Sequence, residues 1–376
     1  MNTKKITSIL LSLILILTCL TLAGCGGSNS GTNSPPAANP SGSGSGPAAP
    51  AAPATDNNNY NLIVSVTFPS ESLPGKTVQE NCDMMTEKSG GRLTFDIHFS
   101  SSLLTPMDAL NGVVNKIADV AYQPSSVIAD YLPINYRILS LPFMGYPSDI
   151  RMLDIYDQLC SDFPEIKGEI ESLGVIAAGT TFSSRFDFYF SKNVNVRTPG
   201  DIKGKKLAST TPIISILLND MGVAPVSITS MDAYTSIDSG VTEGIVIHPN
   251  FLESTRVTEL IETAVLLGDT GLLKEIAMYI MNKEVYDGLP QDLQAIVAEG
   301  FDKLARDQYM NDLNQVDMVF GKLDSQGAQI ITLSAEETEA FAVLADSMKA
   351  GVIADLEKQG IKAQEIYDRA RELAQK

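Results

Sequence analysis

One arginine stands in a segment that is otherwise rich in aromatic residues. Aromatic side chains surround Arg185 on both sides, from Phe182 to Phe190. Such surroundings lower the local dielectric constant, and a planar guanidinium can donate two parallel hydrogen bonds to a carboxylate. The pattern therefore predicts that Arg185 contacts a solute that carries a carboxylate. The alternative is a structural ion pair with Asp187 or another acidic residue.

Polar side chains follow three short apolar segments that we predict to be strands. These polar residues are Tyr122, Gln123 and Ser125 after the first segment, Ser209 and Thr210 after the second, and His248 after the third. In open α/β sheets, ligands bind beyond the carboxyl ends of the strands, so we expect these six residues at a binding cleft. For Tyr122 the alternative is a packing role in the core, and for His248 it is a structural role, with donation to a ligand as the functional one.

The elements that would position these residues alternate between helix and strand. Pro212 begins an apolar helix for which Gly222 is the expected C-cap, and Ile245–Ile247 forms a short strand after a further helix. Apolar residues at every second position predict another strand at 93–99, and an amphipathic pattern predicts a long helix from Pro290 to about Leu323. This alternation indicates an α/β fold with a largely parallel sheet.

The order of residues between 198 and 249 resembles a known family. The matching residues are Thr198, Pro199, Asp201, Lys203, Gly204 and Lys206, followed by Tyr234, Ile237, Gly240, Val241, Glu243, Gly244 and Pro249. In order and spacing they resemble the solute-binding proteins of TRAP (tripartite ATP-independent periplasmic) transporters, the DctP family, from about Asn61 onward. The resemblance implies a two-lobed, periplasmic-binding-protein-like fold of type II character. Each lobe would be a sheet flanked by helices, with a hinge cleft between the lobes.

The resemblance also implies positions in the cleft. Arg185 matches an arginine that reaches the ligand in the family. Phe68 follows the first strand and would stack on a ligand, although it could instead cover the core of a lobe. Phe143 lies in a Leu-Pro-Phe element that resembles one lining the family's cleft.

Two positions depart from the family pattern. The arginine that usually binds the ligand carboxylate is replaced by Ala208, and a position that usually carries an amide falls close to His248. The usual carboxylate clamp is therefore missing from its place. Either Arg185 alone binds the negative group of the solute, or the solute is neutral or amphiphilic.

The first residues predict export and anchoring. Lys4 and Lys5 precede a short apolar run, and Leu22–Cys25 resembles a lipobox. We predict a signal peptide at 1–24 and acylation of Cys25, which would anchor the protein to the cell membrane as a lipoprotein. The alternative is an ordinary secretory signal. Residues 25–59 are rich in Gly, Ser, Pro and Ala and predict a disordered tether.

Composition narrows the choice of partners. The formal net charge is −18, and removing the leader, with two lysines and no acidic residue, makes it −20. Such a charge argues against nucleic acid as a partner. Cys82 and Cys160 lie on predicted apolar helix faces, so we expect buried free thiols, with a disulfide as the alternative. Two cysteines and two separated histidines predict no metal site, and no cofactor is expected.

The resemblance predicts a monomeric, extracytoplasmic solute-binding protein rather than an enzyme. It would capture a small organic acid by hinge closure and deliver it to the small and large membrane subunits of a TRAP permease. The expected lobes are 60–182 with about 270–308, and 183–269 with about 309–376. The alternatives are binding of a neutral or aromatic solute, sensory input to a signalling protein, and a secreted hydrolase, for which the sequence shows no nucleophile or metal motif.

Overall fold

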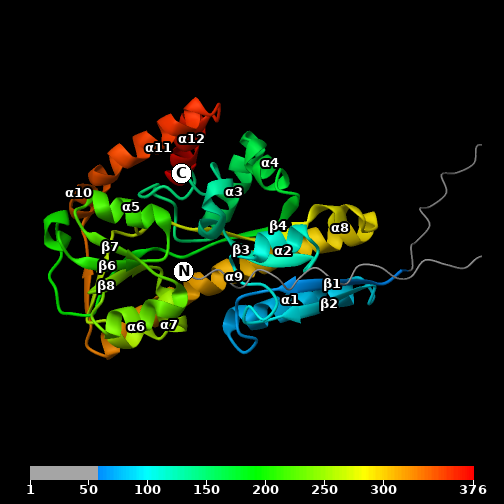
Figure 1. The fold of residues 1–376 in the computed structure, drawn as a ribbon, viewed down its shortest axis with the longest axis horizontal. Helices are drawn as coiled ribbons and strands as arrows, with labels where there is room; N and C mark the ends of the chain where they lie inside the picture. The colour runs from blue at the N-terminus through cyan, green and yellow to red at the C-terminus, as the bar shows by residue number, and fades with distance from the viewer. Residues whose placement is uncertain (1–57) are drawn as a thin grey trace, which may run out of the picture. The chain divides into compact units, whose positions relative to one another are not determined.

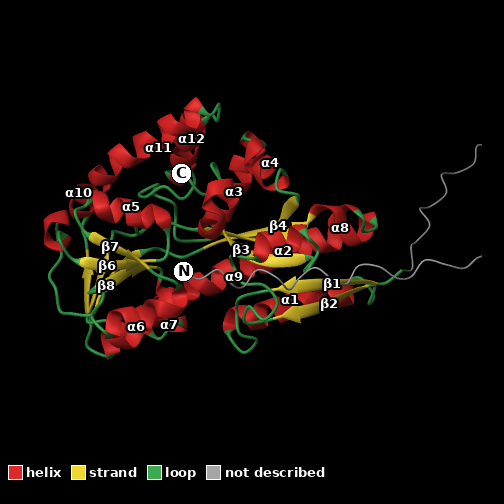
Figure 2. Ribbon diagram, viewed as in Figure 1, coloured by secondary structure: helices red, strands yellow, loops and turns green. Residues whose placement is uncertain are grey.

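The computed structural model describes residues 58–376, which form two β-sheets flanked by helices (Figures 1 and 2). The predicted signal peptide, Cys25 and nearly all of the predicted tether lie outside the described residues. None of the helices within residues 58–376 is both long and apolar enough to cross a membrane.

The first sheet has the strand order β2-β1-β3-β10-β4. Its strands are β1 (Tyr60–Ser65), β2 (Leu93–His98), β3 (Val120–Pro124), β4 (Val175–Phe182) and β10 (Ile276–Asn282). The second sheet has the order β11-β9-β5-β8-β6-β7. Its strands are β5 (Asp187–Phe190), β6 (Lys206–Ser209), β7 (Ala224–Ser227), β8 (Gly244–Ile247), β9 (Thr263–Leu266) and β11 (Gln329–Thr332).

Both sheets are largely parallel, as expected, but each contains one strand that runs antiparallel to its neighbours. β10 runs antiparallel to both of its neighbours in the first sheet, and β5 does the same in the second. β4 is followed directly by β5 in the other sheet, and β9 is followed by β10 in the first. β5 and β10 are each reached directly from a strand of the other sheet. Only parallel neighbours within one sheet need a long crossover connection, so β5 and β10 can pair antiparallel with their neighbours.

Twelve α-helices lie in the described part of the chain. They are α1 (Leu73–Lys88), α2 (Ala109–Val114), α3 (Arg151–Asp162), α4 (Glu165–Glu171), α5 (Pro212–Asp220), α6 (Ala233–Asp238), α7 (Pro249–Ser254), α8 (Lys283–Asp287), α9 (Gln291–Ser325), α10 (Ala335–Ala342), α11 (Asp346–Lys358) and α12 (Ala363–Ala374). Helix α9 contacts both sheets, because its first half packs on β4 and α1 and its second half on β11 and α7 (Figure 1). It is therefore the element that joins the two halves of the fold.

Local sequence signals locate most of these elements well. The long helix expected from Pro290 to about Leu323 is confirmed by α9, and the alternating segment at 93–99 by β2. Gly222 follows the C-cap of α5 and has a φ of +75°, a conformation that glycine adopts without strain. Helix α5 is less buried than its sequence suggests, because Ile216 is exposed.

Candidate functional site

A cavity of about 570 Å³ is lined by residues from both sheets and from α9. The residues at its wall are Thr67, Phe68, Pro69, Ser72, Leu73, Pro74, Pro106, Tyr122, Pro124, Ser126, Val127, Thr181, Phe182, Ser183, Thr210, Ile247, His248, Asn250, Phe251, Glu253, Ser254, Thr255, Glu275, Ala277, Gln308, Asp312 and Gln315. Its size and its mixture of aromatic and polar residues are typical of a site for a small molecule.

Aromatic rings form part of the cavity wall. The rings of Phe68 and Tyr122 have centroids 4.7 Å apart, and Tyr122 also packs edge-on against the buried Tyr279. His248 lies against Phe251, with ring centroids 6.1 Å apart. Such rings offer a ligand flat apolar faces that also attract cations.

Four of the nine ligand-contact candidates lie on this cavity: Phe68, Tyr122, Thr210 and His248. Burial lowers the pKa of His248, and the nearby Asp312 carboxylate raises it by a smaller amount. The imidazole is therefore neutral at neutral pH. Its buried Nδ1 has no hydrogen-bond partner within residues 58–376.

Gln123 and Ser125 do not line the cavity, although both were expected there. Successive side chains of a strand point to opposite faces, so Tyr122 and Pro124 face the cavity while Gln123 points away. Gln123 is fully buried and donates to the carbonyl oxygen of Pro106 at 3.2 Å. Next to the buried Ser125, Ser126 reaches the cavity instead.

Ser209 and Phe143 also lie elsewhere. Ser209 is buried, and its hydroxyl donates to the carbonyl oxygen of Thr211 at 3.0 Å. Phe143 lines a different cavity, next to Arg371, whose guanidinium donates to the Phe143 carbonyl oxygen at 2.7 Å. Ala208 is completely buried within β6, so it offers no group to a solute.

Arg185 is absent from the cavity wall and bound within the protein. Its guanidinium donates to both carboxylate oxygens of Asp187, at 2.5 and 2.9 Å, and to the carbonyl oxygens of Gly268 and Asp269. Burial alone would lower the pKa of Arg185, but the Asp187 carboxylate raises it above its usual range. The geometry is thus that of the structural ion pair, and the predicted ligand contact stays untested.

A buried lysine lies close to this pair. Lys274 is 2% exposed, and its ammonium hydrogen-bonds Ser148 Oγ at 3.3 Å. Burial and repulsion by Arg185 lower the pKa of Lys274 to about 8, whereas Asp312 and Asp187 raise it. Lys274 does not line the cavity.

Sequence reasoning missed the three acidic residues at the cavity, Glu253, Glu275 and Asp312. Asp312 belongs to the buried face of α9, which includes Leu304, Ala305, Gln308 and Tyr309. An acidic residue at three- and four-residue spacing from apolar positions was the signal that could have identified it. The amphipathic pattern was used only to locate the long helix, so this signal was passed over.

Glu275 makes stability depend on pH. Burial raises the pKa of its carboxyl, and the hydrogen bonds from Ser126 lower it by less. A carboxyl whose pKa is raised by folding contributes most stability below its unfolded pKa and loses it as pH rises through the folded pKa. We therefore expect Glu275→Gln to be more stable than the native protein at neutral pH, and this difference in melting temperature to shrink as pH falls from about 8 to about 4.

Melting curves across this range measure both effects. The exposed Glu284, whose pKa is lowered by its bond to Lys116, serves as the control. Because the folded state favours the ionised form of Glu284, Glu284→Gln should be no more stable than the native protein at neutral pH. A lower melting temperature for Glu275→Gln at neutral pH would contradict the prediction.

Cys82 and Cys160 are both buried and free, as expected from their helix faces. Burial raises the pKa of both thiols, that of Cys160 to about 11. Within the described residues, no group of three or more His, Cys, Asp or Glu side chains is arranged to hold a metal ion.

Comparison with known proteins connects this architecture to one family. Residues 64–355 match the DctP model, described as bacterial extracellular solute-binding protein, family 7. A solute-binding protein of Sulfitobacter sp. (strain NAS-14.1) is 24% identical over 62% of this chain and 68% of its own length. The outer membrane transporter protein TsaT of Comamonas testosteroni is 22% identical over 83% of this chain and 90% of its own.

Solved structures share the fold at lower identity. A Bordetella pertussis extracytoplasmic solute receptor, DctP7, which binds pyroglutamic acid, has a TM-score of 0.71 at 16% identity, over 83% of this chain and 99% of its own. A marine metagenome TRAP solute-binding protein specific for aromatic acids has a TM-score of 0.76 at 16% identity, over 85% and 98%. These likenesses show the two-lobed, periplasmic-binding-protein-like fold.

Proposed function

The chain belongs to the DctP family of bacterial extracellular solute-binding proteins, family 7, and from this we propose that it captures a small organic acid outside the cytoplasm and delivers it to a TRAP-type membrane permease. The observation that carries the proposal is the family match over residues 64–355, together with a cavity that both sheets line. Relatives of the same fold are described as binding pyroglutamic acid, an aromatic acid and β-D-galacturonate.

Capture would proceed by closure of two lobes. We assign residues 60–182 with about 270–308 to the first lobe and the rest, 183–269 with about 309–376, to the second. A solute that touches both sides of the cavity makes more contacts in the closed form, so its binding favours closure. No bond is made or broken, in keeping with a family of receptors rather than enzymes.

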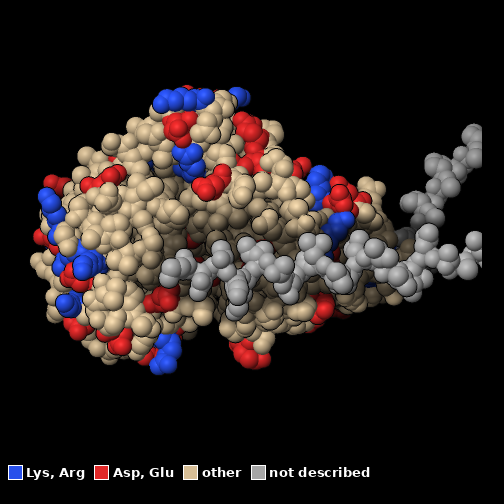
Figure 3. Space-filling view, in the orientation of Figure 1, with Lys and Arg blue, Asp and Glu red and all other residues tan. Residues whose placement is uncertain are grey.

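We further propose that the protein is anchored to the cell membrane and docks on the permease there. Cleavage after residue 24 and acylation of Cys25 would anchor the protein to the membrane, with 25–59 as a tether. The closed monomer would then dock on the small and large membrane subunits of the permease. On the described part of the face seen in Figure 3, lysine and arginine side chains lie among acidic ones.

A thermal-shift screen of the purified chain tests the proposal. The screen compares organic acids, sugar acids and acidic amino acid derivatives with neutral sugars and neutral aromatic compounds. A solute that binds only the native state adds roughly 2.7 kcal/mol of stability at a hundredfold excess over Kd. We expect at least one acid to raise the melting temperature, and no neutral compound to match it.

Two phenylalanine variants connect the shift to the cavity. Phe68→Ala removes a ring at the cavity wall and should reduce the shift that the acid causes. Phe143→Ala removes a ring that lines a different cavity and should leave that shift unchanged, once each variant is compared with its own solute-free melting temperature. If only neutral compounds bind, the ligand class is wrong although the family stands.

A further inference from the structure

The charged side chains at the described cavity wall are all acidic. Among the described residues that line it are three acidic residues, Glu253, Glu275 and Asp312, and no lysine or arginine. A cavity that binds only a carboxylate would be expected to offer it a positive side chain. The acidic residues therefore call for a different complementary group on the solute.

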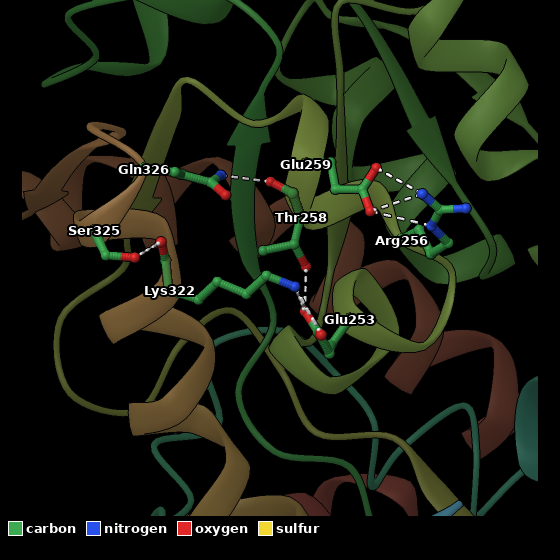
Figure 4. A network of polar contacts seen from close by, with 7 residues as sticks. All are labelled: Glu253, Arg256, Thr258, Glu259, Lys322, Ser325 and Gln326. Carbon is green, nitrogen blue, oxygen red and sulfur yellow. Dashed lines mark hydrogen bonds and ion pairs between the residues drawn. The ribbon is translucent and has the colours of Figure 1, made fainter.

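Glu253 is already neutralised by the protein. Lys322 on α9 donates to both of its carboxylate oxygens at 2.8 Å, and the Thr258 hydroxyl donates at 3.0 Å (Figure 4). The bond from Lys322 lowers the pKa of Glu253. In the same network the Gln326 side-chain amide donates to the Thr258 carbonyl oxygen. This bond fixes the C-terminal end of α9 against the segment that contains Thr258. Glu253 therefore needs no partner from a solute.

Asp312 lacks such compensation. It is only 8% exposed, and its Oδ2 accepts the backbone N–H of Ser184, whereas its Oδ1 has no hydrogen-bond partner among the described residues. A buried carboxylate oxygen without a donor is unfavourable, because the desolvation of the charged group is not offset by a hydrogen bond. The buried Lys274 is close enough for the Asp312 carboxylate to raise its pKa, but within the described residues the two form no ion pair, and Lys274 hydrogen-bonds Ser148 instead. A donor on the solute, directed at Asp312 from the cavity, would supply the missing bond.

Glu275 supplies a second negative group to the same place. It is half-buried, and its Oε1 accepts the backbone N–H of Ser126 at a long 3.3 Å. Burial raises the pKa of Tyr122, and the carboxylates of Glu275 and Asp312 raise it further, so both acids lie near this phenol. The ring of Tyr122 packs against that of Phe68, and aromatic faces attract cations.

We infer that the organic acid captured in this cavity also carries a positively charged nitrogen, so that the solute is a zwitterion of the amino acid class whose ammonium binds Asp312 and Glu275 beside the rings of Phe68 and Tyr122. A neutral hydroxyl could satisfy the hydrogen bonds but would leave two carboxylates uncompensated in a low-dielectric site. A cation satisfies both requirements. This inference rests on the proposed function, because it takes the acid as given and adds the second group.

Calorimetric titration with matched probes tests the inference. Each proteinogenic amino acid is compared with the acid that lacks its amino group and the amine that lacks its carboxylate, as in L-phenylalanine, 3-phenylpropionate and 2-phenylethylamine. We expect an amino acid to bind, and to bind more tightly than its desamino partner. Asp312→Asn keeps an oxygen for the Ser184 N–H and removes the charge, and it should weaken amino acid binding by roughly 30-fold or more.

Two further variants make the test specific. Asp317→Asn makes the same change of charge on α9 at an exposed position outside the cavity wall, and it should leave the affinity unchanged. Glu275→Gln should weaken amino acid binding in the same direction as Asp312→Asn, which keeps the test decisive if one variant does not fold.

The outcomes separate the two proposals. A desamino acid that binds as tightly as its amino acid, or an Asp312→Asn variant with unchanged affinity for the amino acid, overturns the zwitterion and leaves the proposed function standing. An amine that binds as tightly as its amino acid supports the role of Asp312 and overturns the organic acid. If no member of the panel and no other organic acid binds, the proposed function itself fails.

Discussion

Replacing Asp187 with alanine is expected to lower the free energy of unfolding by about 3–5 kcal/mol, since it leaves a buried guanidinium without its counter-charge. Asp187 is completely buried and Arg185 is 8% exposed. Asp187 also accepts the backbone N–H of Leu267 at 2.8 Å, so the variant loses an acceptor at the end of β9 as well. Urea denaturation monitored by circular dichroism measures the loss.

A second pair in the same chain serves as the control. Asp149 and Arg151 have the same two-residue spacing, but both side chains are about half exposed. Because water screens exposed charges, Asp149→Ala should change stability far less than Asp187→Ala. The double variant Arg185→Met/Asp187→Leu should recover much of the loss, because the unpaired charge is gone. Equal losses for Asp187→Ala and Asp149→Ala would show that Asp187 does not have the structural role that its bonds indicate.

The same reasoning bears on ligand binding. If Arg185 serves the fold through Asp187, destabilised variants of this pair should still bind the solute in the fraction that remains folded. A variant that is stable yet loses binding would instead support the ligand contact predicted from the aromatic segment. The comparison therefore tests the expectation that the geometry leaves open.

Gly179→Ala is expected to destabilise the protein by about 1–3 kcal/mol, because there is no room for a side chain between β4 and α9. A Cβ on Gly179 would lie 2.1 Å from the carbonyl oxygen of Phe301 and 3.1 Å from the Cβ of Ala305. Backbone atoms cannot rotate away, so the helix and the strand would have to separate. The unfolding midpoint in urea measures this cost.

Gly321, which lies on α9, should respond to the same substitution in the opposite direction. A Cβ on Gly321 would meet no heavy atom within 4 Å, so Gly321→Ala should stabilise the helix by about 0.5–1 kcal/mol. Gly179→Ala should also weaken solute binding, because it would push α9 away at Phe301. Asp312 lies on the same helix, three turns beyond Phe301, and would move with it. If Gly179→Ala and Gly321→Ala were equally stable, β4 and α9 would not be in close contact.

Much of the secondary structure was predictable from local signals. Alternation of apolar residues located β2, and helical spacing located α9. The capping pattern at Ser334 is a further local signal, since it marks the start of α10, where the serine accepts the Glu337 N–H and the Glu337 carboxylate accepts the Ser334 N–H. These signals succeed because they depend on neighbours within a few residues along the chain.

The binding cavity was predictable only in part. The rule that ligands bind beyond strand ends placed Tyr122, Thr210 and His248 near the cavity, but it does not give the direction of each side chain. Gln123 lies one residue from Tyr122 and points to the opposite face of the same strand. Register within the sheet decides between the two, and register depends on partner strands far away in the sequence.

The family, the α/β class and the positions of most elements can be predicted from the amino-acid order, because they follow from composition, local periodicity and ordered motifs. Tertiary structure alone decided which charges meet. It paired Arg185 with Asp187 and two carbonyl oxygens, and it brought Asp312 of α9 to the same cavity as Glu275 and Tyr122. The physical reason is that electrostatic interactions depend on distance and burial in space, and residues 122, 275 and 312 become neighbours only when the sheets and α9 have packed.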